Sequence, residues 1–234
     1  MFNGDAGSGP SEIRRYLIEN DWLDAIVQLP NNAFYNTGIA TYIWIVMKNK
    51  PAIHQGKVQL IDASGCASSR RKNIGSKNVD ISKACRDLII EAYGAYVDGT
   101  YNGVDENDNT IIVKSKVMDA IDLGYNKIVV ETPQFDDDGN IIMKKKKPVA
   151  DTSKRDTENV PLAEDIDAYF EREVIPYNPH AWIDKAKTKV GYEIPFTRTF
   201  YEYKQIEPSD VIAARIEKHE KSLMAKLHDL FGGE

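Results

Sequence analysis

Two apolar segments separated by a turn-rich stretch constrain the fold of this chain most strongly. Residues 23–29 (Leu-Asp-Ala-Ile-Val-Gln-Leu) are largely apolar and stop at Pro30, and residues 41–47 (Thr-Tyr-Ile-Trp-Ile-Val-Met) are rich in β-branched and aromatic side chains. Both patterns predict buried β-strands. Residues 57–61 predict a third strand, and Ser11 begins a segment with helical apolar spacing. This order of elements indicates an α/β protein whose helices cover a sheet.

The composition is that of an ordinary globular chain, and it narrows the possible partners. The chain has 234 residues, is 42% hydrophobic and 28% charged, and carries a formal net charge of −6. This acidic balance excludes a generally basic nucleic-acid binder, so DNA contact requires a local patch or a partner. Cys66 and Cys85 lack metal-ligand spacing, and no apolar run approaches the ~20 residues of a membrane span. We expect no metal site, no membrane segment and a cytoplasmic location.

The middle of the chain predicts a helix, a hairpin and irregular connections. Residues 76–93 have helical apolar spacing, whereas residues 101–109 are acidic and turn-rich. Strands are predicted at 128–131 and 141–144, joined by a turn that contains Asp138-Gly139, a strong hairpin signal. A second helix is predicted at 161–174, with Pro161 as its first residue.

The end of the chain predicts one long helix, residues 209–231. Apolar residues recur in it every seven positions, which is typical of a helix-packing seam. The seam and its flanking positions are Ile212, Ile216, Leu223, Leu227 and Leu230. Such a seam either docks a partner helix or packs on its own domain, and both interpretations remain open. We divide the chain into an α/β part (1–98), an irregular hairpin insertion (99–157) and a helical docking region (158–234).

Phe34 and Tyr35 lie in the turn between the first two predicted strands. Two adjacent rings in a turn are not needed for a core. They either stack on a base taken out of its helix, where stacking contributes ~1–3 kcal/mol, or fold back onto the sheet. The one dense basic run consists of Lys144, Lys145, Lys146 and Lys147. This run either contacts DNA phosphates or forms a solvated loop.

The glycine-rich segment 4–9 (Gly-Asp-Ala-Gly-Ser-Gly) precedes the first predicted helix. Glycine loops at helix N-termini bind phosphates or the methionine end of S-adenosylmethionine. Such a loop follows a buried strand, and the next strand ends in an acid that binds the ribose hydroxyls. Here the next strand ends in Gln28-Leu29-Pro30. We therefore expect an ordinary loop.

Several segments closely resemble the modification (M) subunit of type I restriction–modification systems. They recur in the family's order across almost the whole chain. The segments are Ile13–Leu17, Asp24–Pro30, Phe34–Ile39, Lys57–Ser64 and Val190–Phe196, followed by Arg198 and Phe200-Tyr201.

The resemblance implies a DNA adenine-N6 methyltransferase that uses S-adenosylmethionine and works with a specificity (S) and a restriction (R) subunit. It implies the C-terminal edge of a Rossmann-like methyltransferase sheet, followed by a mixed α+β, mainly helical region. Phe34 matches the family position whose ring stacks on the flipped adenine, and Tyr35 is its neighbour. The C-terminal helix matches the part of the family that docks to the S subunit.

The chain departs from the family in two motifs. The cofactor motif Asp-Pro-x-x-Gly-Ser-Gly and the catalytic motif Asn-Pro-Pro-Phe/Tyr lie upstream of this region in the family, and neither occurs here. The Asn-Pro-Pro loop supplies the acceptors that aim the adenine amine at the methyl group. We therefore expect the C-terminal part of an M subunit, inactive alone, with no catalytic or cofactor-binding residue. The alternative is a non-enzymatic interaction module that docks through its C-terminal helix.

Overall fold

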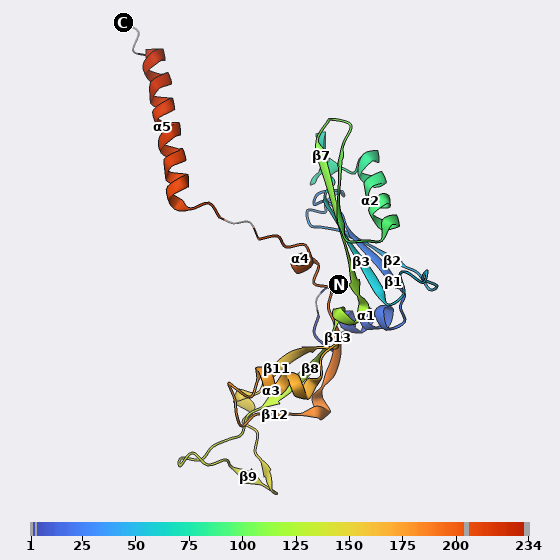
Figure 1. The fold of residues 1–234 in the computed structure, drawn as a ribbon, viewed down its shortest axis with the longest axis vertical. Coiled ribbons are helices and arrows are strands. Elements are labelled where there is room, and N and C mark those ends of the chain that lie inside the picture. Colours follow the sequence, from blue (N-terminus) through green and yellow to red (C-terminus); the bar gives the residue numbers. More distant parts are fainter. Residues whose placement is uncertain (1, 3, 204–205, 232–234) are drawn as a thin grey trace. The chain divides into compact units, whose positions relative to one another are not determined.

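The structure is a computed structural model that describes residues 2, 4–203 and 206–231. It consists of two compact units, residues 1–200 and 201–234. The first unit contains two larger sheets with the helices that pack on them and two two-stranded hairpins. The second unit contains the helix α5 (Ser209–Phe231) (Figure 1). The helix predicted at 209–231 is confirmed. The finer division at residues 98 and 157 stays a prediction.

The main sheet contains both parallel and antiparallel neighbours. Its strands, in spatial order, are β2 (Tyr42–Val46), β1 (Leu23–Gln28), β3 (Lys57–Gly65), β7 (Thr110–Asp119) and β6 (Gly99–Val104). β1 runs antiparallel to β2 and parallel to β3. The three strands predicted from apolar content form, and β1 is buried as predicted. The prediction that residues 41–47 form a buried strand is wrong, because β2 is the edge strand of the sheet and none of its residues is buried. The α/β class is confirmed.

Helices and a chain segment bury the two faces of this sheet. Helix α2 (Lys83–Ala95) packs one face through Cys85, Leu88 and Ala92 against residues of β3 and β7. Helix α1 (Gly9–Glu19) and residues 192–196 pack the other face, where Val58 and Leu60 of β3 point. Successive residues of β3 therefore serve opposite cores, as the two-residue period of a strand requires.

The second sheet is built around β8 (Gly124–Glu131). It pairs antiparallel with β11 (Asp156–Pro161), β12 (Trp182–Ile183) and β13 (Lys189–Tyr192). Helix α3 (Ile166–Glu173) packs against this sheet through Phe170. The remaining elements are short: β4 (Ser68–Ile74), β5 (Lys77–Asp80), β9 (Met143–Lys144), β10 (Lys147–Pro148), α4 (Phe196–Thr199) and three 3-10 turns at 120–123, 152–154 and 185–187.

Two predicted helices begin later than their apolar spacing indicates, because a capping residue fixes each start. Ser82 accepts a hydrogen bond from the Cys85 amide at 3.2 Å, so α2 starts at Lys83 and residues 77–80 form β5 instead. Asp165 accepts one from the Ala168 amide at 2.9 Å, so α3 starts at Ile166. Pro161 ends a strand rather than beginning this helix.

The middle of the chain contains more strand than expected. Residues 101–104 belong to β6, so the prediction of a turn is right only for residues 105–109. The turn at 136–140 forms, with the Gly139 amide donating to the Asp136 carbonyl at 3.0 Å. The predicted pairing of 128–131 with 141–144 is wrong, because β8 pairs with β11 and β9 pairs with β10.

In the part of the chain that the structure describes, no helix has the length and apolar content needed to cross a membrane.

Candidate functional site

The loop between β1 and β2 holds Phe34 and Tyr35. At its base the Leu29 amide donates to the Thr41 carbonyl at 2.8 Å, which closes the loop onto the sheet. Within the loop, the Thr37 amide donates to the Phe34 carbonyl at 3.3 Å. Asn36 adopts a left-handed backbone with φ of 51°, a conformation that asparagine tolerates better than most residues. The loop is therefore an ordered turn.

Both aromatic rings of this loop are exposed. Phe34 is 47% and Tyr35 63% accessible to solvent, although the adjacent Ala33 is buried. Neither ring contacts another aromatic ring among the residues that the structure describes. The rings therefore present apolar surface outward from the turn that joins the buried strand β1 to the edge strand β2.

The hairpin of β4 and β5 lies against this loop. A Cβ atom on Gly75, at the hairpin tip, would sit 2.9 Å from Cε2 of Tyr35 and 2.8 Å from Oδ1 of Asn36. Gly75 has φ of 58°, so glycine suits the tip both for its backbone and for this close approach. The sequence did not predict this hairpin, although its Gly75-Ser76 step is a turn signal, and nothing in the sequence indicates its contact with the loop.

A buried carboxylate anchors the base of the hairpin. Ser68 Oγ donates to Asp105 Oδ2 at 2.8 Å, and the amides of Asn107 and Asn109 donate to Oδ1 at 2.8 and 2.9 Å. The bonds from Asn109, followed by the one from Ser68, hold the pKa of Asp105 well below its usual range. Asp105 is therefore a carboxylate that ties the hairpin to the turn between β6 and β7.

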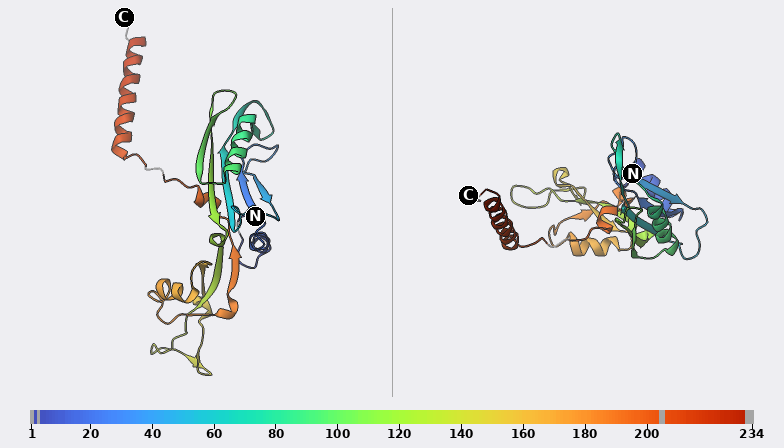
Figure 2. Two further views of the ribbon diagram at one scale, coloured as in Figure 1. Left: turned by 45° about the vertical axis from the view of Figure 1, so that its right-hand side comes forward. Right: turned by 90° about the horizontal axis from the view of Figure 1, so that it is seen from above.

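The run Lys144–Lys147 forms a second basic hairpin, away from the aromatic loop. Lys145 and Lys146 occupy the turn between β9 and β10 with positive φ angles of 52° and 63°, and the run is exposed. Figure 1 and the left view of Figure 2 show this hairpin at one end of the first unit, beyond the β8 sheet and away from β1 and β2. The structure thus does not bring this run and Phe34 together.

The seam of α5 is largely exposed. Ile216, Leu223, Leu227 and Leu230 are between 40% and 76% accessible to solvent. Ile212 is partly buried. These side chains form an apolar stripe along α5.

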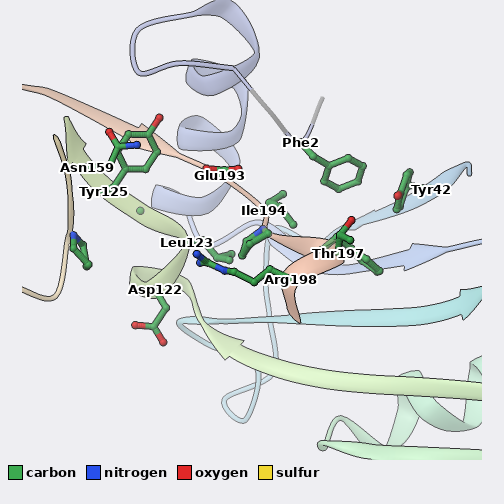
Figure 3. A pocket seen from close by; sticks show the side chains of 14 residues that line it. Phe2, Tyr42, Asp122, Leu123, Tyr125, Asn159, Glu193, Ile194, Thr197 and Arg198 are labelled. Atoms are coloured by element: carbon green, nitrogen blue, oxygen red, sulfur yellow. The ribbon is translucent and has the colours of Figure 1, made fainter. Parts of the chain in front are cut away.

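A pocket of about 630 Å³ lies between the two sheets of the first unit (Figure 3). One wall is aromatic, with the Phe2 and Tyr42 ring centroids 4.2 Å apart and Phe196 beside Tyr42. The rest includes Asp122, Glu193 and Arg198, which carry charges of both signs. The candidate residues derived from the sequence do not line this pocket.

A hydrogen-bonded cluster lies near the start of β1. The fully buried Asp24 accepts a bond from Tyr93 Oη at 2.6 Å and lies 2.9 Å from Nδ1 of His54. Burial, followed by the bond to Asp24, raises the pKa of Tyr93 to about 12. Tyr96 stacks on His54 with ring centroids 3.5 Å apart. This cluster joins β1 to α2 and to Tyr96, the residue after the end of α2.

The polar groups of the glycine-rich segment 4–9 make contacts within the fold. Ser8 caps α1 by accepting a bond from the Ser11 amide at 3.4 Å, and Asp5 pairs with Lys127 Nζ at 2.6 Å. The polar groups thus serve helix capping and contact with the second sheet. Among the described residues there is also no cluster able to hold a metal ion.

Comparisons with known proteins converge on one family. The N-6 DNA methylase family model matches residues 1–133. The chain is 41% identical over 78 residues to the type I restriction enzyme MjaIX methylase subunit of Methanocaldococcus jannaschii, covering 32% of this chain and 14% of that protein. It is 36% identical over 70 residues to the MpnII methylase subunit of Mycoplasma pneumoniae, covering 29% and 12%.

Among solved structures, the type I restriction-modification system methyltransferase subunit from Streptococcus thermophilus matches with a TM-score of 0.39 and 24% identity, over 52% of this chain and 21% of that one. The matched region spans only about 14% of the length of the first curated relative. The family model, however, covers more than half of the 234 residues. The chain belongs to the N-6 DNA methylase family.

Proposed function

We propose that this chain forms part of the target-base pocket in the M subunit of a type I restriction–modification system, a DNA adenine-N6 methyltransferase. The observation that carries the proposal is the exposure of Phe34 and Tyr35 on an ordered turn between two strands. Enzymes that modify a base extrude it from the duplex and commonly hold it against aromatic side chains. Phe34 supplies such a surface for the adenine, with Tyr35 beside it.

The chain's own residues account for holding the base but not for methyl transfer. Transfer requires acceptors that position the adenine amine toward the methyl donor. The Phe34 ring offers no such acceptor, and segment 4–9 does not fit S-adenosylmethionine. The proposal therefore assigns the cofactor and the catalytic acceptors to the complete subunit, with this chain at the C-terminal edge of a Rossmann-like sheet. Such a system acts on DNA in the cytoplasm.

Replacing Phe34 with alanine in a complete M subunit that carries this region should reduce kcat/KM for DNA methylation by about 10- to 100-fold. The reason is the loss of stacking worth ~1–3 kcal/mol. Methyl transfer to a cognate duplex measures the effect, and Phe34→Tyr should retain most activity. Phe135→Ala is the matched control, since Phe135 is an exposed ring outside the loop. Unchanged turnover in Phe34→Ala would remove the ring from the site.

We also propose that α5 docks to a helix of the S subunit, with the R subunit and DNA as further partners in the assembled complex. The exposed apolar stripe of α5 supports this, because helix pairs bury such stripes against each other. A non-enzymatic module that docks through α5 is the second candidate, and the same stripe favours it. If the chain is such a module, Phe34→Ala should leave every activity of the complex unchanged.

The double substitution Ile216→Asp and Leu223→Asp should abolish co-purification with a cognate S subunit, because it puts two carboxylates into the apolar stripe. Lys218→Asp with Lys221→Asp is the control: it also introduces two aspartates into α5 but leaves the seam residues unchanged. Circular dichroism checks that both variants keep their helix. Retained co-purification of the seam variant would place the interface elsewhere.

A further inference from the structure

We propose, resting on the function proposed above, that the β4–β5 hairpin is an arm that binds the DNA backbone beside the extruded base. Its ligand is the phosphate groups that flank the target nucleotide. The observations that carry this are the charge of the hairpin, the pairing of its side chains, and the contact between its tip and the aromatic loop.

The hairpin is strongly basic in an acidic chain. It carries Arg70, Arg71, Lys72 and Lys77 against the single carboxylate of Asp80, whereas the chain as a whole has a net charge of −6. A local excess of cations on a negatively charged protein is the electrostatic pattern of a site for a polyanion.

The pairing within the hairpin leaves two of these cations available. Arg70 forms an ion pair with Asp80, and Lys77 Nζ lies 2.9 Å from the same carboxylate. The bond from Arg70, followed by that from Lys77, lowers the pKa of Asp80. The side chains of Arg71 and Lys72 are exposed, and the described residues offer them no ion pair or hydrogen-bond partner.

The hairpin places these cations next to the proposed base site. Its tip at Gly75 touches Tyr35 and Asn36, and Lys72 lies three residues before that tip. An extruded base remains joined to its sugar, so the phosphates on either side must pass close to the ring that holds it. The unpaired cations therefore belong to the same short hairpin that contacts the aromatic loop, three and four residues before its tip.

The hairpin is also held in place before any ligand arrives. Ser68 bonds to the buried Asp105 at its base, and the Arg70–Asp80 pair links its two strands. An arm fixed in this way loses little conformational entropy on binding. The Lys145–Lys146 turn carries a similar charge, but it belongs to the β9–β10 hairpin at one end of the first unit, away from β1 and β2 (Figure 1).

Fluorescence anisotropy of the full chain tests the proposal, with a labelled duplex that carries an unpaired 2-aminopurine in place of the target adenine. Arg71→Gln with Lys72→Gln should weaken binding about 10-fold near 0.1 M salt. It should also reduce the slope of log K against log salt by about 2, since each neutralised phosphate contributes ~0.9. Lys145→Gln with Lys146→Gln removes the same charge and should leave the slope unchanged. Thermal unfolding monitors the fold of both variants.

Phe34→Ala in the same assay separates this proposal from the proposed function. That variant should lose the quenching of 2-aminopurine fluorescence while keeping the wild-type salt slope. One outcome supports the arm and contradicts the base pocket: the Arg71/Lys72 variant has a smaller salt slope, but Phe34→Ala still quenches 2-aminopurine fluorescence. An unchanged slope in the Arg71/Lys72 variant, an equal fall in the Lys145/Lys146 variant, or no DNA binding by the wild-type chain at low salt would each overturn the arm. The methylation assay still tests the base pocket in those cases.

Discussion

Replacing Arg14 with methionine should lower the free energy of unfolding of this chain by about 3 kcal/mol. Arg14 is fully buried, and its guanidinium donates from Nε to the Tyr192 carbonyl and from Nη2 to the Gly4 carbonyl, the latter at 2.9 Å. These bonds tie α1 to β13 and to the segment before α1. Burial in this site lowers the pKa of the Arg14 guanidinium.

Methionine keeps much of the side-chain length but supplies no donor. The carbonyls that Arg14 bonds would lose their partner inside the protein, at a cost of ~1–3 kcal/mol each. Urea unfolding followed by circular dichroism measures the change. Arg15→Met is the matched control, because Arg15 is partly exposed and pairs with Glu19 at 2.9 Å on the surface of α1. Such surface pairs contribute ~0–1 kcal/mol, so an equal loss in both variants would contradict a special role for Arg14.

The strands of the main sheet were predictable where apolar content was continuous. β1 is buried from Leu23 to Val27, and its sequence shows this directly. β7 was missed although its buried positions alternate through Ile111, Val113 and Ser115. Ser115 weakens that pattern, and only the structure explains its burial: its Oγ accepts a bond from Gln59 Nε2 at 2.8 Å. A polar residue buried by a partner 56 positions away is invisible to local periodicity.

The candidate site was predictable to a similar extent. The exposure of Phe34 follows from its place in a polar turn, which the sequence indicates. The contact of Gly75 with Tyr35 joins residues far apart in sequence, so no spacing argument could identify it. The start of α2, in contrast, has a local signal. Ser82 is a good N-cap residue, but the longer apolar pattern placed the predicted start at residue 76, six residues before this cap.

Replacing Gly191 with alanine should lower the free energy of unfolding by about 1–3 kcal/mol, the usual cost of forcing extra volume into a packed site. Gly191 of β13 is buried and lies opposite Tyr125 of β8 in the strand register. A Cβ atom on it would sit 2.5 Å from Cζ and 2.7 Å from Oη of the Tyr125 ring. The ring must therefore move, and because Tyr125 lines the pocket of Figure 3, the shape of that pocket must change with it.

A double-mutant cycle separates this clash from a general intolerance of alanine in β13. In a Tyr125→Ala background the ring is absent, so Gly191→Ala should cost much less than in the wild type. Strictly additive losses would mean that the Tyr125 ring is not what excludes a side chain at position 191. Gly94→Ala in α2 provides the opposite control, because a Cβ atom on Gly94 would have no described atom within 4 Å beyond its own helix backbone. Alanine there should raise stability by up to ~1 kcal/mol, since it favours the helix without meeting a neighbour.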